Sequence, residues 1–158
     1  MSLSSIYERL IVLNSEYARC INSDQLEKWP DFFQENCLYK ITTAANVKNG
    51  FDAGIIYADS KAMLADRINA LRNANIYERQ RYRHILGLPY VVEDAERECA
   101  VQTPFVVIRI MGSGQMELFA SGEYRDRVTV LSADELKFAE RIVVCDGDRF
   151  DTLLAIPL

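Results

Sequence analysis

Residues 97–131 contain two long strand-like runs joined by a glycine-rich turn: RECAVQTPFVVIRIMGSGQMELFASGEYRDRVTVL. Apolar and polar side chains alternate along Arg97–Met111 and again along Gln115–Leu131, which is the period expected of strands with one buried face. Gly112-Ser113-Gly114 lies between the runs and predicts a hairpin turn. We expect antiparallel neighbours, because a parallel crossover needs about a dozen residues.

Two similar runs flank this hairpin, Arg81–Val92 before it and Leu136–Cys145 after it. Turn-forming residues at Glu93-Asp94-Ala95 and Ser132-Ala133-Asp134 connect the four runs, which predicts an antiparallel meander. Cys37–Thr43 predicts one more strand. Alternation along the last run predicts two faces, with Leu136, Phe138, Ile142 and Val144 on one and Lys137, Ala139, Arg141 and Val143 on the other.

The first half of the chain has the pattern of helices. Apolar residues recur at spacings of three and four in the first of them: Leu3, Ile6, Leu10, Leu13, Tyr17 and Cys20. A short second helix is expected after Ser23 or Asp24, and a third over about Ser60–Asn75. Asn46–Gly54, which contains an Asn-Gly pair, is expected to be a loop.

Three helices followed by an antiparallel meander indicate an α+β fold. Strands this long twist and bend, so we expect a curved, mostly antiparallel sheet that wraps around the three N-terminal helices as a cone. No repeat or Pro/Gly-rich linker interrupts the 158 residues. The interpretation is therefore one domain, residues 1–158.

Composition excludes several classes of partner. The net charge is −5 and the pI is near 5.0, which argues against a nucleic-acid surface, since such a surface needs Lys and Arg to displace counterions. No apolar run approaches the ~20 residues that span a bilayer, and no secretory signal follows Met1. We expect a cytoplasmic protein that binds neither nucleic acid nor membrane.

The chain has a single histidine, His84, and four dispersed cysteines with no C-x-x-C pair. A mononuclear iron site with two His and one carboxylate needs two imidazoles. A Rieske cluster also needs two His, beside two Cys. One copy of this chain can build neither site, so we expect reduced, mostly buried thiols and no metal or cofactor site here.

His84 lies in a run of cations and tyrosines, and the run admits two interpretations. In a stand-alone cone enzyme, His84 with a carboxylate such as Asp66 could act as an acid–base pair. Alternatively, the run is a contact surface for a partner protein, because Arg and Tyr are enriched at interface hot spots. The candidate interface residues are Tyr77, Arg79, Arg81, Tyr82, Arg83 and His84.

The apolar tail Leu153–Leu158 is expected to pack on the chain's own core or on a neighbour. From Ile6 to Leu158 the sequence resembles the small (beta) subunits of bacterial aromatic-ring-hydroxylating dioxygenases. Within that family it is most similar to the terephthalate dioxygenase and salicylate 5-hydroxylase types. The motifs that carry the resemblance are Trp29-Pro30-Asp31-Phe32-Phe33, Asp59-Ser60, Asp66-Arg67-Ile68, Arg81-Tyr82-Arg83-His84, Ala120-Ser121-Gly122-Glu123-Tyr124 and Asp151-Thr152-Leu153-Leu154-Ala155-Ile156-Pro157-Leu158.

The resemblance implies a nuclear-transport-factor-2-like cone and a hetero-oligomer, usually of three large and three small subunits. It also implies that the large (alpha) subunit holds a Rieske [2Fe–2S] cluster and a mononuclear Fe(II), and that the small subunit is mainly structural. The expected function is a non-catalytic subunit of an oxygenase that hydroxylates the ring of an aromatic acid. Two alternatives remain open: a stand-alone isomerase or dehydratase that uses His84, and a homo-oligomeric module that binds a small apolar ligand.

Overall fold

The structure is a computed structural model that describes residues 3–52, 54–74, 79–147 and 156–158. Helical segments come first, and strands dominate from Gln80 onward, as the change in periodicity predicts. The elements are α1 (Leu3–Asn22), η1 (a 3-10 helix, Leu26–Phe32), β1 (Phe33–Thr43), α2 (Ala44–Lys48), β2 (Ile56–Ala58), α3 (Lys61–Asn73), β3 (Gln80–Leu86), β4 (Tyr90–Asp94), β5 (Glu98–Met111), β6 (Met116–Val130) and β7 (Leu136–Cys145).

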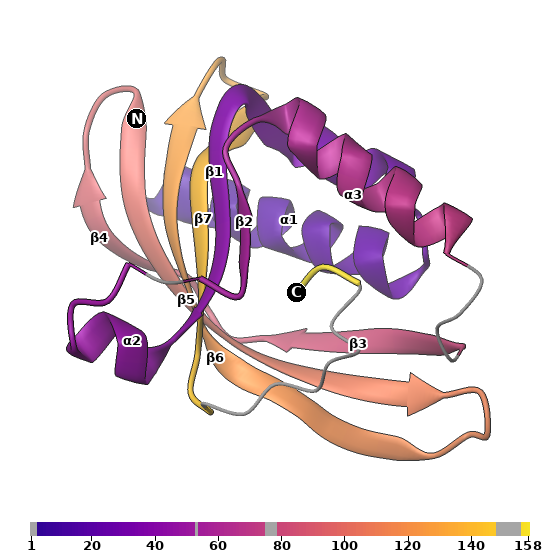
Figure 1. Cartoon of the computed structure of the whole chain (residues 1–158). Coiled ribbons are helices and arrows are strands. Elements are labelled where there is room, and N and C mark those ends of the chain that lie inside the picture. The colour runs from indigo at the N-terminus through magenta and orange to yellow at the C-terminus, as the bar shows by residue number, and fades with distance from the viewer. Residues whose placement is uncertain (1–2, 53, 75–78, 148–155) are drawn as a thin grey trace.

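Within the described residues the strands form one seven-stranded sheet, in the order β2-β1-β7-β6-β5-β3, with β4 also paired to β5. β1 and β7 run parallel, and the other neighbours are antiparallel. The two longest strands, β5 and β6, bend along their length, so that one end of the sheet passes beneath α1 in the view of Figure 1. The predicted α+β fold with a curved, mostly antiparallel sheet is confirmed.

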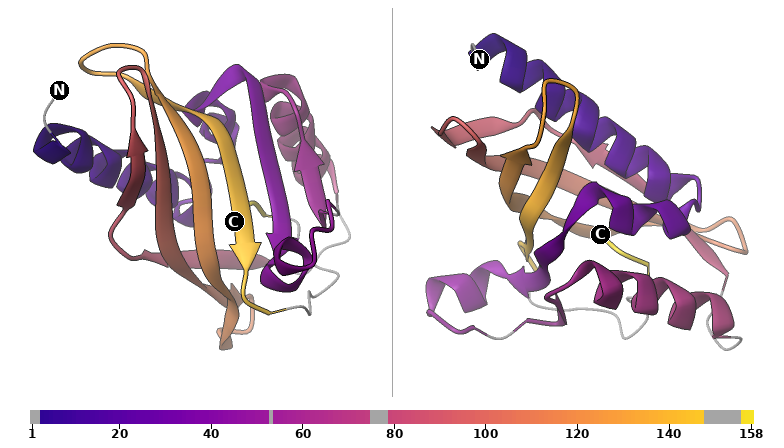
Figure 2. Two further views of the ribbon diagram at one scale, coloured as in Figure 1. Left: turned by 90° about the vertical axis from the view of Figure 1, so that its left-hand side faces the viewer. Right: turned by 90° about the horizontal axis from the view of Figure 1, so that it is seen from above.

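The core lies between this curved sheet and the helices. α1 packs against β3 and η1, while α3 packs against η1 and β1, and Figure 2 shows both helices behind the strands when the sheet faces the viewer. Aromatic rings fill the centre in edge-on contacts. The Trp29 ring lies 5.7 Å from Phe33 and 5.0 Å from Tyr39, and Tyr17 lies 5.8 Å from Phe138.

The predicted strand Arg81–Val92 is in fact two strands, β3 and β4, which pair with different halves of β5. They separate at Gly87, whose main-chain N–H donates to the Pro104 oxygen at 2.8 Å. A Cβ on Gly87 would overlap the ring of Pro104. The approach of the two backbones at this bend therefore requires glycine. The loop predicted over residues 46–54 also contains the end of α2.

The predicted orientation of β7 is wrong after Ala139. Val128 of β6 pairs with Phe138 and Arg127 pairs with Glu140, which leaves Ala139 as an extra residue in β7. Such a bulge shifts the alternation by one position. Arg141 therefore lies in the interior on the same side as Phe138, and both side chains are fully buried.

Candidate subunit interface and cone interior

The basic-aromatic run divides between the two faces of β3. Arg81 and Arg83 are exposed, as is Arg79 directly before the strand, whereas Tyr82 and His84 are buried. This follows from the two-residue period of a strand. The three arginines are thus accessible to a partner, and the tyrosine and histidine belong to the core. Tyr77, the remaining predicted interface residue, lies outside the described residues.

His84 fastens the edge of β3 to the end of α1. Its main-chain N–H donates to Asn22 Oδ1 at 2.9 Å, and its ring Nδ1 lies 2.9 Å from the same oxygen. Nδ1 therefore carries the proton in the neutral ring, because an amide oxygen only accepts. The free edge of β3 receives a hydrogen bond that no strand supplies, which gives the single histidine a structural role.

The acid–base pair of His84 with Asp66 is not formed. Asp66 is exposed on α3, and within the described residues His84 makes no hydrogen bond to a carboxylate. Burial, together with the positive charge of Arg141, lowers the pKa of His84 to about 3. A general acid or base works best when its pKa lies near the operating pH, so a buried imidazole with so low a pKa is a poor proton acceptor near pH 7. The stand-alone cone enzyme is therefore not favoured.

A buried ion pair between Arg141 and Asp126 occupies the cone interior. Arg141 Nε donates to Asp126 Oδ1 at 2.9 Å and Nη2 donates to Oδ2 at 2.8 Å, and both side chains are almost fully buried. Burial opposes the charged guanidinium, but the facing carboxylate raises the pKa of Arg141 above its usual range. Burial also raises the pKa of Asp126, and Arg141 limits that increase. The two-point geometry holds the pair ionised.

Aromatic rings and an amide complete the surroundings of this ion pair. The guanidinium carbon of Arg141 lies 3.8 Å from the Tyr124 ring centre, 4.0 Å from Phe138 and 4.3 Å from Tyr17. Asn14 Oδ1 accepts from Arg141 Nη2 at 2.7 Å, and Asn14 Nδ2 donates to Thr103 Oγ1 at 3.2 Å. The cation on β7 is therefore held by side chains of α1 and β6, and Asn14 extends the network to β5, an arrangement suited to fixing these elements to one another.

The sequence reasoning missed this cluster, although one signal was present. Tyr124, Asp126 and Val128 alternate along β6, and the outer two are apolar and buried. The same period places Asp126 between them on the inner face, and a carboxylate there needs a cation. The sequence pattern assigned the cation, Arg141, to the opposite face, because the bulge at Ala139 reverses the face on which Arg141 lies.

The last described residues pack into the core, as one of the two alternatives for the tail predicted. Ile156 and Leu158 are buried. The Leu158 main-chain oxygen accepts from Tyr17 Oη at 2.8 Å and from Tyr39 Oη at 3.1 Å. The Leu158 N–H in turn donates to Tyr39 Oη at 3.1 Å. Residues 153–155 of the predicted tail lie outside the described residues.

The four cysteines are free and buried. Burial raises the pKa of the Cys20 and Cys99 thiols to about 11 and that of Cys145 to about 12, so these thiols are protonated and unreactive near pH 7. In the described part of the chain, no group of three or more His, Cys, Asp or Glu residues is arranged to hold a metal. Nor does any described helix have the length and apolar character needed to cross a membrane.

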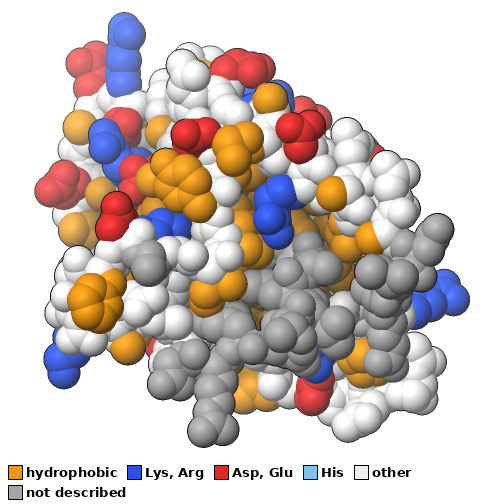
Figure 3. Space-filling view, viewed as in Figure 1, with side chains coloured by type: hydrophobic (Ala, Val, Ile, Leu, Met, Phe, Trp, Pro, Cys, Tyr) orange, Lys and Arg blue, Asp and Glu red, His pale blue; other side chains and the backbone are white. Residues whose placement is uncertain are grey.

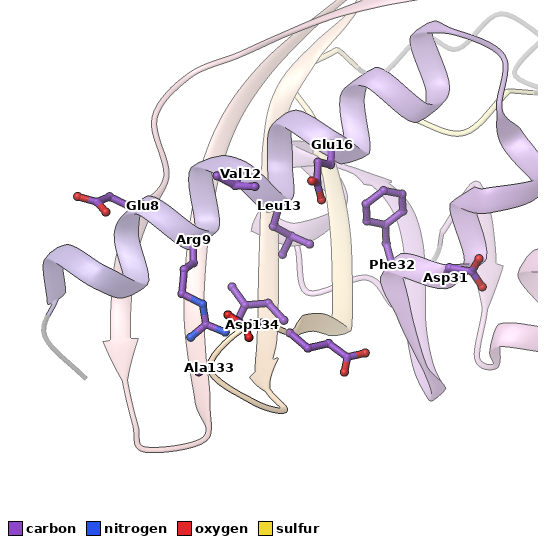
Figure 4. A pocket seen from close by; sticks show the side chains of 11 residues that line it. Glu8, Arg9, Val12, Leu13, Glu16, Asp31, Phe32, Ala133 and Asp134 are labelled. Atoms are coloured by element: carbon purple, nitrogen blue, oxygen red, sulfur yellow. The ribbon is translucent and has the colours of Figure 1, made fainter.

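Two surface hollows flank α1 and differ in charge. The first, of about 540 Å³, lies between α1, η1 and the β6–β7 turn, and Figure 4 shows its carboxylates around an apolar floor. The second, of about 460 Å³, is lined by Arg19 and Arg83 and by no carboxylate. On the face that carries β1 and β2, Figure 3 shows hydrophobic side chains in separate groups among charged ones.

Comparison with known proteins places the chain in one family. The family model described as "Ring hydroxylating beta subunit" matches residues 16–152. Over 150 residues the chain is 49% identical to the terephthalate 1,2-dioxygenase terminal oxygenase component subunit beta 1 of Comamonas sp, covering 95% of this chain and 97% of that protein. It is 34% identical to the anthranilate 1,2-dioxygenase small subunit of Burkholderia cepacia, covering 94% and 92% of the two chains.

A solved structure agrees with the sequence comparison. A crystal structure from Novosphingobium aromaticivorans, described as the beta subunit of an aromatic-ring-hydroxylating dioxygenase, superposes with a TM-score of 0.89 at 32% identity and covers 97% of each chain. The cone is therefore of the nuclear-transport-factor-2-like type. The chain belongs to the family of ring-hydroxylating dioxygenase beta subunits.

Proposed function

We propose that the chain is the structural small subunit of a Rieske non-haem iron oxygenase that hydroxylates the ring of an aromatic acid. The observation that carries this proposal is 49% identity, over 95% of the chain, to a subunit of a terephthalate dioxygenase. The anthranilate enzyme, which is also named for an aromatic acid, supports the same substrate class. The buried, neutral His84 is consistent with a chain that does not itself carry out the reaction.

In the proposed complex, the Rieske cluster and the mononuclear Fe(II) reside on a large (alpha) subunit. Two electrons from NAD(P)H, delivered through a reductase, and one O₂ give a dihydrodiol, or a phenol and water if one oxygen atom is inserted. This chain supplies a rigid cone, and it self-associates as a trimer on which the large subunits assemble. Four free cysteines support the reducing cytoplasm as its compartment.

The test is co-expression of the tagged chain with a large oxygenase subunit encoded beside it. We expect the two to co-purify, iron to be retained with the large subunit, and O₂-dependent hydroxylation of an aromatic acid after a reductase is added. A panel of terephthalate, anthranilate and benzoate identifies the substrate. About one iron per chain in the small subunit purified alone, or isomerase or dehydratase activity of that chain, would overturn the proposal.

The control variant is His84→Gln, which removes the imidazole and keeps a polar side chain at the strand edge. If the complex forms with this variant, it should turn over at an unchanged rate, because no iron ligand or proton donor has been lost. An assembled complex without activity would instead assign His84 to the chemistry.

A further inference from the structure

Two surfaces of opposite charge lie at opposite ends of β6, and we propose that one docks on the other in a neighbouring copy of this chain. The inference rests on the proposed self-association and names the surfaces that would form it. We call them the acidic groove, formed by Glu8, Glu16, Asp134, Val12, Phe32 and Leu136, and the basic face, formed by Arg81, Arg83, Ile85, Met116 and Leu118.

The acidic groove has an apolar floor and a rim with unused negative charge. Phe32 and Leu136 are half-buried, and Val12 is 54% exposed. Within the described residues, neither Glu16 nor Asp134 forms an ion pair, and Glu8 does not either. Two further carboxylates of the groove, Asp31 and Glu135, are already paired with lysines of this chain, at 3.2 Å and 3.6 Å, while Arg9 donates to the Ser132 main-chain oxygen at 2.7 Å.

The basic face is the outer surface of the sheet, opposite Tyr82 and His84. Its residues are in register across three strands: Arg83 pairs with Ile108, which pairs with Leu118, and Arg81 pairs with Ile110, which pairs with Met116. Cross-strand partners share a face. Met116 and Leu118 are each 70% exposed and Ile85 is 54% exposed.

The positive charges of this face also have no ionic partner among the described residues. Within the described part of the chain, Arg81 and Arg83 form no ion pair, and Arg83 continues into the basic hollow beside Arg19. An uncovered apolar surface bordered by charges is typical of a protein contact rather than of a monomer surface. The complementary partner has an apolar centre and an acidic rim, which is the description of the acidic groove.

The positions of the two surfaces determine the kind of assembly. Met116 and Leu118 begin β6, whereas the turn that carries Asp134 follows its end. At about 3.3 Å per residue, the 15 residues of β6 separate the two surfaces by up to roughly 45 Å. One copy therefore offers its groove to one neighbour and its basic face to another. Such a head-to-tail contact gives a ring when the rotation between neighbours closes and an open filament when it does not, and the proposed trimer is the closed form.

The experiment reverses the charges separately and then together in the full chain. The groove variant is Glu16→Lys with Asp134→Lys, the face variant is Arg81→Glu with Arg83→Glu, and the fourfold variant combines them and keeps the net charge at −5. The matched control is Lys28→Glu with Lys48→Glu, two exposed lysines outside both surfaces. Sedimentation equilibrium measures self-association, and circular dichroism checks the fold.

We expect each twofold reversal to weaken self-association by about 100-fold or more, because like charges then face each other. The control should change it little, and the fourfold variant should restore it. Reversals that leave association unchanged, a fourfold variant that stays dissociated, or a wild-type monomer at micromolar concentration would each overturn the inference. If a reversed chain fails to fold, the neutral pairs Glu16→Gln with Asp134→Asn, and Arg81→Gln with Arg83→Gln, are measured instead. Each neutral pair should weaken self-association. If neither pair weakens it, the proposed docking of the two surfaces is refuted.

Failure of this inference is distinguishable from failure of the proposed function. If the chain co-purifies with the large subunit while the reversals do not alter self-association, only the docking surfaces are wrong. If no large subunit binds, the proposed function fails whatever the charge reversals do.

Discussion

Replacing Arg141 by Met tests whether the buried ion pair holds the cone together. The substitution keeps a long side chain among the three rings but leaves the Asp126 carboxylate in the interior without its cation. Breaking a buried pair from one side costs about 3–5 kcal/mol of unfolding free energy, because an uncompensated charge remains. For a domain of this size, that corresponds to a fall in melting temperature of about 6–20 °C.

A second variant and a control separate charge from packing. In the double variant Arg141→Met with Asp126→Leu no charge is left behind, so its cost should be clearly smaller than that of Arg141→Met alone. Arg125→Met removes an arginine from β6 whose side chain is 44% exposed and pairs with Glu123 at 2.7 Å. We expect that change to cost about 0–1 kcal/mol.

The pH dependence of the unfolding free energy tests the same prediction independently. Without Arg141, burial alone acts on Asp126 and raises its native pKa further above the unfolded value. A carboxyl whose pKa is higher in the native than in the unfolded chain destabilises the folded state at high pH, where the group must ionise. This destabilisation becomes smaller as the pH falls. Urea unfolding of Arg141→Met should therefore show a smaller loss, relative to wild type, at about pH 5 than at about pH 8. A loss below about 1 kcal/mol that does not vary with pH would refute the reasoning.

Three further predictions follow from single contacts. The His84 pKa is about 6.5 in the unfolded chain and is lowered to about 3 in the native one. Wild type should therefore lose stability as pH falls below about 6.5, by up to ~1.4 kcal/mol per pH unit, and His84→Gln should lose less over that range in urea titrations. Gly122→Ala should sharply lower the melting temperature, because its Cβ would overlap the Val144 main-chain oxygen, whereas Gly147→Ala, with open space around it, should not. Tyr39→Phe removes two hydrogen bonds to Leu158 and should cost about 1–3 kcal/mol in chemical unfolding; an unchanged midpoint would show that this anchor does not contribute.

Several elements could be predicted because their cause is local. The period of α1 and the alternation along β5 and β6 depend only on which side chains avoid water, and those elements are present as expected. The short turn at residues 112–114 required antiparallel pairing whatever the rest of the chain did. A single histidine likewise limited the metal chemistry by counting alone.

Other features depend on contacts between distant residues. The division of the run at residues 81–92 into two strands follows from the approach of Gly87 to Pro104, 17 positions further along the chain. The His84 site needs Asn22, 62 residues away. Neither partner is marked by local periodicity, so a pattern of apolar residues identified the strand but not its division or its edge.

The sequence by itself thus determined the succession of helices and strands, the α+β class and the family, because these follow from local periodicity and from motifs that keep their order along the chain. Tertiary structure decided which cation meets the buried Asp126 carboxylate, because the face of Arg141 depends on strand pairing. One extra residue at Ala139 turned Arg141 inward to Asp126, while the undisturbed alternation of β3 left Arg81 and Arg83 outside. The physical reason is that a strand has only two faces, and a single bulge, set by pairing with another strand, exchanges them.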